Sequence, residues 1–273
     1  LAGTALLHSA AVMEKRDALK IWTIFLAILA FSLSLLGTFL VRSGVLTSVH
    51  SFASDPQRGV FILAILVFFI GGSLALFALR ASALKPGGIF APVSREGALV
   101  LNNLLLTTSC ATVFIGTLYP LALEAVTGEK ISVGAPFFNL TFGPLFIPII
   151  LAMPIGQMLA WKRGDLLGAA QRLVLACALG LVGMMALYAL RGGSVMPAIL
   201  AGLAIYLTIG SFVEIYGRLR GAQNAASFMA RALGLPRSAW GTAIAHAGVG
   251  LTLFGLAATG WGLSLIHISE PTR

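Results

Sequence analysis

The stretch IWTIFLAILAFSLSLLGTFLV, from Ile21 to Val41, contains no charged side chain in 21 residues. As an α-helix it would be about 30 Å long, which matches the hydrocarbon thickness of a bilayer. Lipid offers no hydrogen-bond partner to an exposed backbone, so a segment of this kind crosses the membrane as a helix. The stretch therefore predicts a transmembrane helix.

Six further apolar segments follow, separated by short connectors that carry charges, Gly or Pro. They are Gly59 to Leu79, Gly97 to Leu118, Phe138 to Trp161, Leu173 to Leu190, Val195 to Tyr216 and Trp240 to Gly260. An apolar stub, Leu1 to Met13, precedes them, and we interpret it as the inner half of a span whose outer half is absent. We predict an all-α fold: a polytopic helical membrane bundle of about eight transmembrane segments, the first one truncated.

The composition excludes a soluble globular protein. Charged residues make up 10% of the chain and hydrophobic residues 58%, whereas a soluble domain carries about 25% charged residues. The mean hydropathy is +0.97.

The net charge of +9 follows the positive-inside pattern of membrane proteins. If the spans alternate, thirteen basic residues lie on the side of the loop from Glu14 to Lys20 and four on the other side. The first side is then cytoplasmic, and the loop from Leu40 to Gly59 faces the periplasm if the membrane is a bacterial inner membrane. This pattern implies the lipid bilayer as partner and no nucleic acid.

The last residues, LSLIHISEPTR from Leu263 to Arg273, differ in composition from the apolar spans before them. We interpret residues 263–273 as the translation of a sequencing adapter and not as native protein. Residues 1–262 then form the transmembrane region.

Common catalytic motifs are missing from the sequence, and we assign no catalytic residue. Cys110 and Cys177 lie inside spans without C-x-x-C spacing, so neither a thioredoxin-like site nor covalent attachment of c-type haem is supported. The sequence has no P-loop, H-E-x-x-H or G-x-S-x-G motif.

Two histidines lie inside spans, where an ionisable side chain is costly and normally functional. His8 lies six residues before Glu14, and His246 lies six residues after Trp240. Both are thus about 9 Å from the cytoplasmic end of their span. Two imidazoles at one level could ligate a haem iron from both faces. Hydrogen bonds to neighbouring helices, or a proton relay, would also account for them.

The periplasmic loop holds a third histidine, His50, between two arginines. Ser54 and Asp55 before Pro56 predict a helix that begins at Pro56. Arg42 and Arg58 could hold the propionates of a haem that His50 ligates. Alternatively, the arginines anchor the helix ends among lipid headgroups.

One long motif covers this loop and both adjoining helix ends: GTFLVRSGVLTSVHSFASDPQRGVFIL. Shorter motifs are LAGTALLHS, LLTTSCATVFIGTLYPL, EKISVGAPFFN and GTAIAHAGVGLTLFG. Together they resemble the CcmF family of bacterial cytochrome c maturation, a haem-handling family related to the CcsA and NrfE types. The resemblance extends from Leu1 to about residue 262, and it implies a tryptophan-rich segment upstream and a periplasmic domain downstream.

The resemblance implies a role for each histidine. His8 and His246 match the two transmembrane ligands of a resident haem b, and His50 matches a periplasmic ligand of the incoming haem. The implied activity is that of a haem lyase subunit, which helps to form thioether bonds between haem vinyl groups and C-x-x-C-H thiols. The expected partners are a CcmE-like haem chaperone, CcmH-like and CcmI-like subunits, and apocytochrome c.

Three alternatives stay open from the sequence. An NrfE-type paralogue would serve a nitrite reductase cytochrome. A transporter would show broken helices and midplane charges, and one span does contain Pro144, Pro148 and Pro154, although no acid lies beside them. A scaffold subunit would dock the maturation partners without binding haem.

Overall fold

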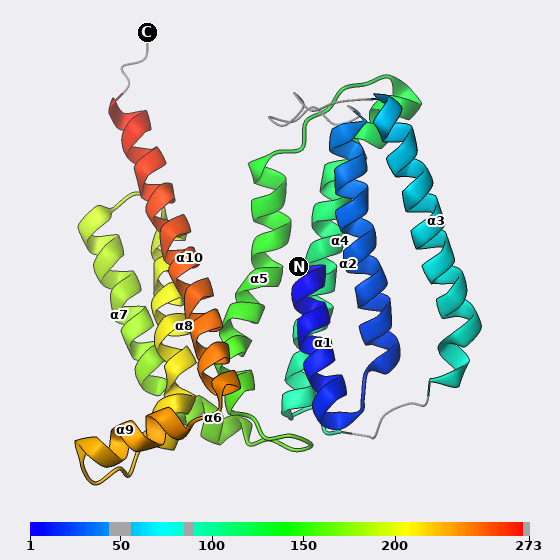
Figure 1. Cartoon of the computed structure of the whole chain (residues 1–273). Helices are drawn as coiled ribbons and strands as arrows, with labels where there is room; N and C mark the ends of the chain where they lie inside the picture. The colour runs from blue at the N-terminus through cyan, green and yellow to red at the C-terminus, as the bar shows by residue number, and fades with distance from the viewer. Residues whose placement is uncertain (44–55, 85–89, 270–273) are drawn as a thin grey trace. The chain divides into compact units, whose positions relative to one another are not determined.

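The computed structural model describes residues 1–43, 56–84 and 90–269, with the side chains of residue 56 and of residues 262–269 left aside. The described part is helical and contains no strand. Its helices are α1 (Ala2–Arg16), α2 (Lys20–Arg42), α3 (Pro56–Arg80), η2 (Ala81–Ala83), α4 (Arg95–Thr127), α5 (Ala135–Met158), α6 (Leu166–Arg172), α7 (Val174–Arg191), α8 (Val195–Leu219), α9 (Ala225–Gly234) and α10 (Arg237–Ser269) (Figure 1).

Seven helices in this described part are long and apolar enough to cross a membrane: α2, α3, α4, α5, α7, α8 and α10. They coincide with the seven full spans expected from hydropathy, so this prediction is confirmed. The stub forms α1, whose 15 residues are too few to cross a bilayer. Helix α3 begins at Pro56, as the sequence predicts.

The chain divides into two compact units. The first comprises Leu1–Phe90 and Leu99–Ile147, and the second comprises Ala91–Ala98 and Pro148–Arg273.

In the first unit, α1 packs against α2, and α2 against α3. Helices α1 and α2 meet at a sharp turn, where Asp17 and Leu19 both have left-handed backbone conformations. A buried hydrogen bond of 2.8 Å joins the hydroxyls of Ser9 in α1 and Thr23 in α2. At the other end of α2, Gly59 of α3 lies so close to Ser43 that a Cβ would come within 3.1 Å of the Ser43 Cα.

The outer surface of this unit is apolar. Phe61 and Phe68 of α3 expose 68% and 73% of their surface. Such side chains are stable when they face lipid, which is as apolar as they are.

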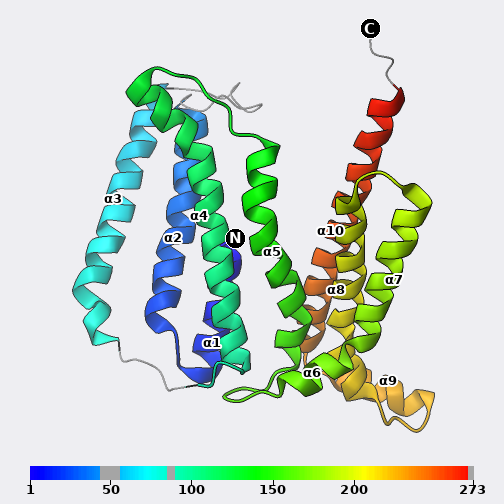
Figure 2. The same ribbon diagram turned by 180° about the vertical axis from the view of Figure 1, so that it is seen from behind.

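In the second unit, α8 lies between α7 and α10 and packs against both (Figure 2). Small buried residues on α8, including Ala201, Gly202 and Ala204, let its neighbours approach closely. A Cβ on Gly180 of α7 would come within 2.8 Å of the Gly202 carbonyl oxygen. On the α10 side, a Cβ on Gly250 would lie 3.1 Å from the carbonyl oxygen of Ala204.

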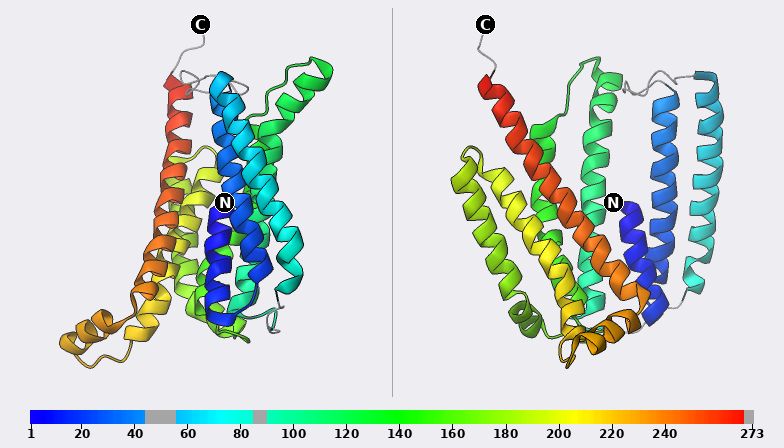
Figure 3. Two further views of the ribbon diagram at one scale, coloured as in Figure 1. Left: turned by 45° about the vertical axis from the view of Figure 1, so that its right-hand side comes forward. Right: turned by 60° about the vertical axis from the view of Figure 1, so that its left-hand side comes forward.

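Three short helices, η2, α6 and α9, were not expected from the sequence. Helix α9 connects α8 to α10 and runs crosswise to them beyond their ends (Figure 3). Helix α5 is continuous from Ala135 to Met158 despite its three prolines, so this span lacks the break that a transporter site would predict.

Candidate functional site

His246 lies on α10 of the second unit, where it is half-buried. Its Nδ1 is hydrogen-bonded to the side-chain amide of Gln157. Gln157 belongs to the last turn of α5, 89 residues earlier in the chain. The hydrogen bond therefore fixes the orientation of the imidazole from a neighbouring helix.

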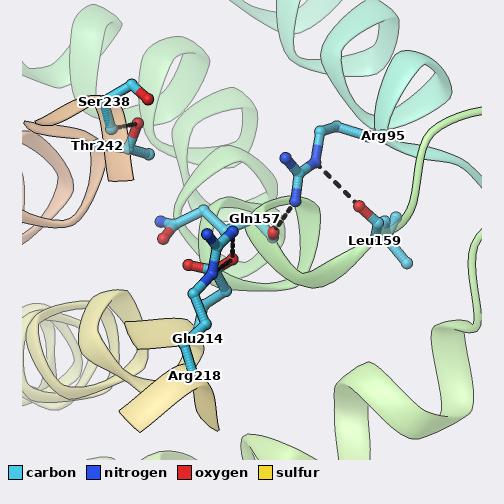
Figure 4. A network of polar contacts seen from close by, with 7 residues as sticks. All are labelled: Arg95, Gln157, Leu159, Glu214, Arg218, Ser238 and Thr242. Carbon is cyan, nitrogen blue, oxygen red and sulfur yellow. Dashed lines mark hydrogen bonds and ion pairs between the residues drawn. The ribbon is translucent and has the colours of Figure 1, made fainter. Parts of the chain in front are cut away.

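The backbone of Gln157 is itself held in place by Arg95, the first residue of α4 (Figure 4). The guanidinium of Arg95 donates to the carbonyl oxygens of Gln157 and, over 2.9 Å, of Leu159. These carbonyls lie at the C-terminus of α5, where they lack helical donors and where a cation is favourable. Arg95 also lies 5.5 Å from the ring centroid of Trp161.

Residues 91–96 and 157–164 pair through further hydrogen bonds around Arg95. The Arg95 amide donates to the carbonyl of Ala160 over 3.0 Å. The carboxylate of Glu96, which is fully buried, accepts from the Lys162 amide over 2.8 Å. A buried carboxylate needs such partners because its desolvation is costly. The start of α4 and the end of α5 thus form one rigid support for Gln157.

An ion pair lies close to this support (Figure 4). Glu214 and Arg218 are one turn apart on α8, and the Arg218 guanidinium donates to a Glu214 carboxylate oxygen. Together with Arg95, they form a cluster of charged side chains beside the start of α4 and the end of α5.

His8 lies on α1 of the first unit, where it is also half-buried. Its Nδ1 lies 2.8 Å from the carbonyl oxygen of Thr4, one turn earlier, a contact in which the ring N–H donates. His8 precedes the helix end at Arg16 by about 12 Å, and His246 follows the helix start at Arg237 by about 14 Å. Each imidazole is thus at a similar distance from the basic end of its own helix.

The two transmembrane histidines belong to different units, and their meeting at one iron stays a prediction. Arg42 is the last residue of α2, and Arg58 lies in the first turn of α3. The contact between Gly59 and Ser43 brings these two helix ends together. His50 lies outside the described residues, so its role as a ligand stays a prediction too.

Sequence reasoning did not find Gln157, Arg95 or Glu96. Gln157 is one of two side-chain amides in its apolar span, the other being Asn139, and a polar side chain among apolar ones was the signal available for it. Nothing in the sequence connects it to His246, because hydropathy does not say which helices are neighbours.

The sequence is 67% identical over 258 residues to the cytochrome c-type biogenesis protein CycK of Rhizobium meliloti (strain 1021), covering 94% of this chain and 38% of the relative. It is 46% identical over 261 residues to the cytochrome c-type biogenesis protein CcmF of Pseudomonas aeruginosa, with the same two coverages. A solved structure of the cytochrome c heme lyase CcmF matches with a TM-score of 0.64 at 30% identity, over 94% of this chain and 37% of that one. The chain belongs to the CcmF family. No protein-family model matches the sequence.

The chain spans 38% of the length of these CcmF-type relatives. Over this length the CcmF-type chain is a multi-pass helical membrane protein.

Its two transmembrane histidines have the chemistry that a haem requires. Metal-ligating histidines usually engage their second ring nitrogen in a hydrogen bond, which fixes the tautomer and the ring orientation. Both His8 and His246 engage Nδ1, with Thr4 and Gln157 respectively. Nε2 of His8 is then the nitrogen that would bind iron, and Nε2 of His246 would do so once the Gln157 amide presents its oxygen to Nδ1–H, so the residues fit the group.

Proposed function

We propose that this chain binds a haem b through His8 and His246 and takes part in cytochrome c maturation. In this role it helps to transfer haem from a chaperone to the thiols of apocytochrome c. The observation that carries the proposal is the hydrogen bond between Gln157 and His246 within a chain of the CcmF family. An intramembrane imidazole with a dedicated partner from another helix is typical of a metal ligand.

Haem bound by two imidazoles supplies electron transfer, because it has no open coordination position for oxygen chemistry. The task of the chain is to hold the two rings in the right orientation. Thr4 accepts from His8 within α1, so this ring is oriented locally. Gln157 orients His246 from α5, and Arg95 anchors Gln157.

His50 is proposed to ligate the substrate haem on the periplasmic side of the inner membrane. Arg42 is the last residue of α2 and Arg58 lies in the first turn of α3, at neighbouring helix ends. Guanidinium groups bind carboxylates through paired hydrogen bonds, so they suit the two haem propionates. The proposed partners are a CcmE-like chaperone, CcmH-like and CcmI-like subunits, and apocytochrome c.

The proposal is tested by the absorption spectrum of the purified chain. We expect a b-type spectrum with two axial imidazoles, and loss of haem in His8→Ala and in His246→Ala. His50→Ala should keep the resident haem and lose transfer to apocytochrome c in a maturation assay with the partner subunits.

Two results would contradict the proposal. A colourless chain that supports maturation would favour the scaffold alternative. Full haem content in both His8→Ala and His246→Ala would assign the haem to other ligands. Maturation of nitrite reductase cytochromes alone would instead favour the alternative role, that of an NrfE-type paralogue.

A further inference from the structure

Helix α9 carries an exposed apolar stripe along one side. Phe228, Met229 and Leu233 expose 43%, 58% and 80% of their surface. At 100° per residue these three side chains fall on one side of the helix, while Ser227 and Arg231 fall on the other. The helix is therefore amphipathic, and its apolar side is partly exposed.

The orientation of α9 on the second unit is fixed by contacts near its C-terminal end. Asn224 and Ser227 form a reciprocal capping box at its start. The indole of Trp240 on α10 donates to the carbonyl oxygen of Ala232 over 3.1 Å. Ala232 and Leu235 pack against the buried cluster of Ile215, Leu219 and Ala243. At 100° per residue Ala232 falls between Phe228 and Met229, so the stripe begins at the contact with this cluster and extends from it to the exposed Leu233.

The position of α9 along the bilayer normal follows from its two neighbours. Helix α8 has 25 residues and is about 37 Å long, which exceeds the hydrocarbon thickness of about 30 Å. Its end at Leu219 therefore lies among the headgroups. The guanidinium of Arg231 reaches back to the carbonyl of Arg220 over 3.5 Å, so α9 stays at that level. Its crosswise course places its axis along the membrane plane (Figure 3).

The charge of this connection complements an anionic lipid surface. Residues 217–239 contain four arginines and no acid. One of them, Arg218, pairs with Glu214 on α8. Arg220, Arg231 and Arg237 remain as positive charge around the stripe, and basic residues next to an apolar helix face are typical of helices that lie on membranes.

We infer that α9 is an interfacial helix: its stripe of Phe228, Met229 and Leu233 inserts into the headgroup layer, and Arg220, Arg231 and Arg237 bind anionic phospholipid headgroups. The inference concerns how the second unit is seated in the membrane, and it does not depend on haem.

The test places a nitroxide label on each side of α9 in a chain whose Cys110 and Cys177 are replaced by alanine. Met229→Cys puts the label in the stripe, with Leu233→Cys as a second stripe position. Gly234→Cys is the matched control, since it is exposed on the other side and a Cβ there meets nothing within 4 Å. The labelled chains are reconstituted in nanodiscs of phosphatidylcholine, with or without phosphatidylglycerol. Collisions with oxygen report lipid, and collisions with a water-soluble nickel chelate report solvent.

We expect the stripe labels to favour oxygen and the Gly234→Cys label to favour the nickel chelate. Phosphatidylglycerol should increase this contrast at least twofold, and replacement of the three arginines by glutamine should abolish the increase. Equal access of the nickel chelate to all three labels in both lipids would overturn the inference and leave the stripe to a protein partner. A contrast that does not respond to phosphatidylglycerol would overturn the assignment of anionic headgroups.

Discussion

The side-chain amide of Gln157 in α5 contacts Nδ1 of His246 in α10. An amide can turn either its nitrogen or its oxygen toward a ring nitrogen, and the two choices select opposite tautomers of the imidazole. When the amide nitrogen donates to Nδ1, as in this structure, the ring proton lies on Nε2. When the amide oxygen accepts from Nδ1–H, the lone pair lies on Nε2. Iron at Nε2 therefore requires the second arrangement, which a half-turn of the Gln157 amide produces.

Gln157→Leu should weaken haem binding, because His246 loses the partner that orients its ring. Loss of such a partner typically lowers metal affinity by about 10- to 100-fold. Gln157→Glu should retain haem and lower its midpoint potential, since a carboxylate accepts more strongly from Nδ1–H and makes the imidazole a better donor to ferric iron. Haem titration and redox titration of the purified variants measure the two effects.

The control for this pair is Gln171→Leu, which changes an exposed glutamine on α6 of the same unit. It should leave both haem affinity and potential unchanged. If Gln157→Leu and Gln157→Glu shift neither quantity while His246→Ala loses haem, Gln157 has no part in positioning the ligand.

Arg95→Lys should destabilise the second unit by about 2 kcal/mol, because hydrogen bonds to a charged donor each contribute roughly 1.5 to 3 kcal/mol. A lysine keeps the charge and loses the planar fork that reaches the carbonyls of Gln157 and Leu159 together. Thermal unfolding in detergent measures the change. Arg163→Lys, at an exposed arginine of the same connection, should be neutral. Equal melting temperatures of the two variants would show that Arg95 is not a structural clamp.

The helices that cross the membrane could be predicted because a backbone in lipid must satisfy its own hydrogen bonds, and an α-helix does so. A run such as Ile21 to Val41 has a single stable conformation in lipid, and α2 extends it by one residue at each end. The predicted end of α4 at Leu118 was too early, because the helix continues through Pro120 to Thr127. A proline lacks a backbone N–H donor and favours the end of a helix, but the hydrogen bonds of the neighbouring turns can still form, so the helix can continue.

The support of the candidate site could not be predicted in the same way. His8 and His246 were found because an imidazole in an apolar span is rare. Gln157 and Arg95 act through partners distant in sequence, and their pairing depends on which helix ends meet. Helix α9 was missed for a different reason: ten residues are too few to give a hydropathy signal.

Ser9→Ala and Thr23→Val should each destabilise the first unit by about 1 kcal/mol, the usual contribution of a buried hydrogen bond. Thr23 also donates to the Leu19 carbonyl, so its hydroxyl keeps one partner when Ser9 is removed. The double variant should therefore cost less than the sum of the single ones, with a coupling of about 0.5 to 1.5 kcal/mol. Thr38→Val, at an exposed threonine of α2, is the control. Strict additivity would mean that the two hydroxyls do not stabilise each other.

Gly250→Ala should separate α10 from α8 and disturb His246 as well. A Cβ at this position would overlap Thr208 Oγ1 and lie 3.1 Å from the carbonyl oxygen of Ala204, so one helix must shift. Overpacking of this kind costs about 1 to 3 kcal/mol. Because Gly250 lies one turn after His246, the shift also moves the imidazole away from Gln157.

The matched control for this variant is Gly248→Ala on the same helix. A Cβ at Gly248 meets nothing within 4 Å, and alanine is the better helix former by about 1 kcal/mol. Gly248→Ala should therefore unfold at the same temperature as the unchanged chain or higher, with its haem spectrum unaltered. Gly250→Ala should unfold earlier and bind less haem. If both variants kept the same stability and the same spectrum, the close approach of α8 and α10 would not be what holds His246 beside Gln157.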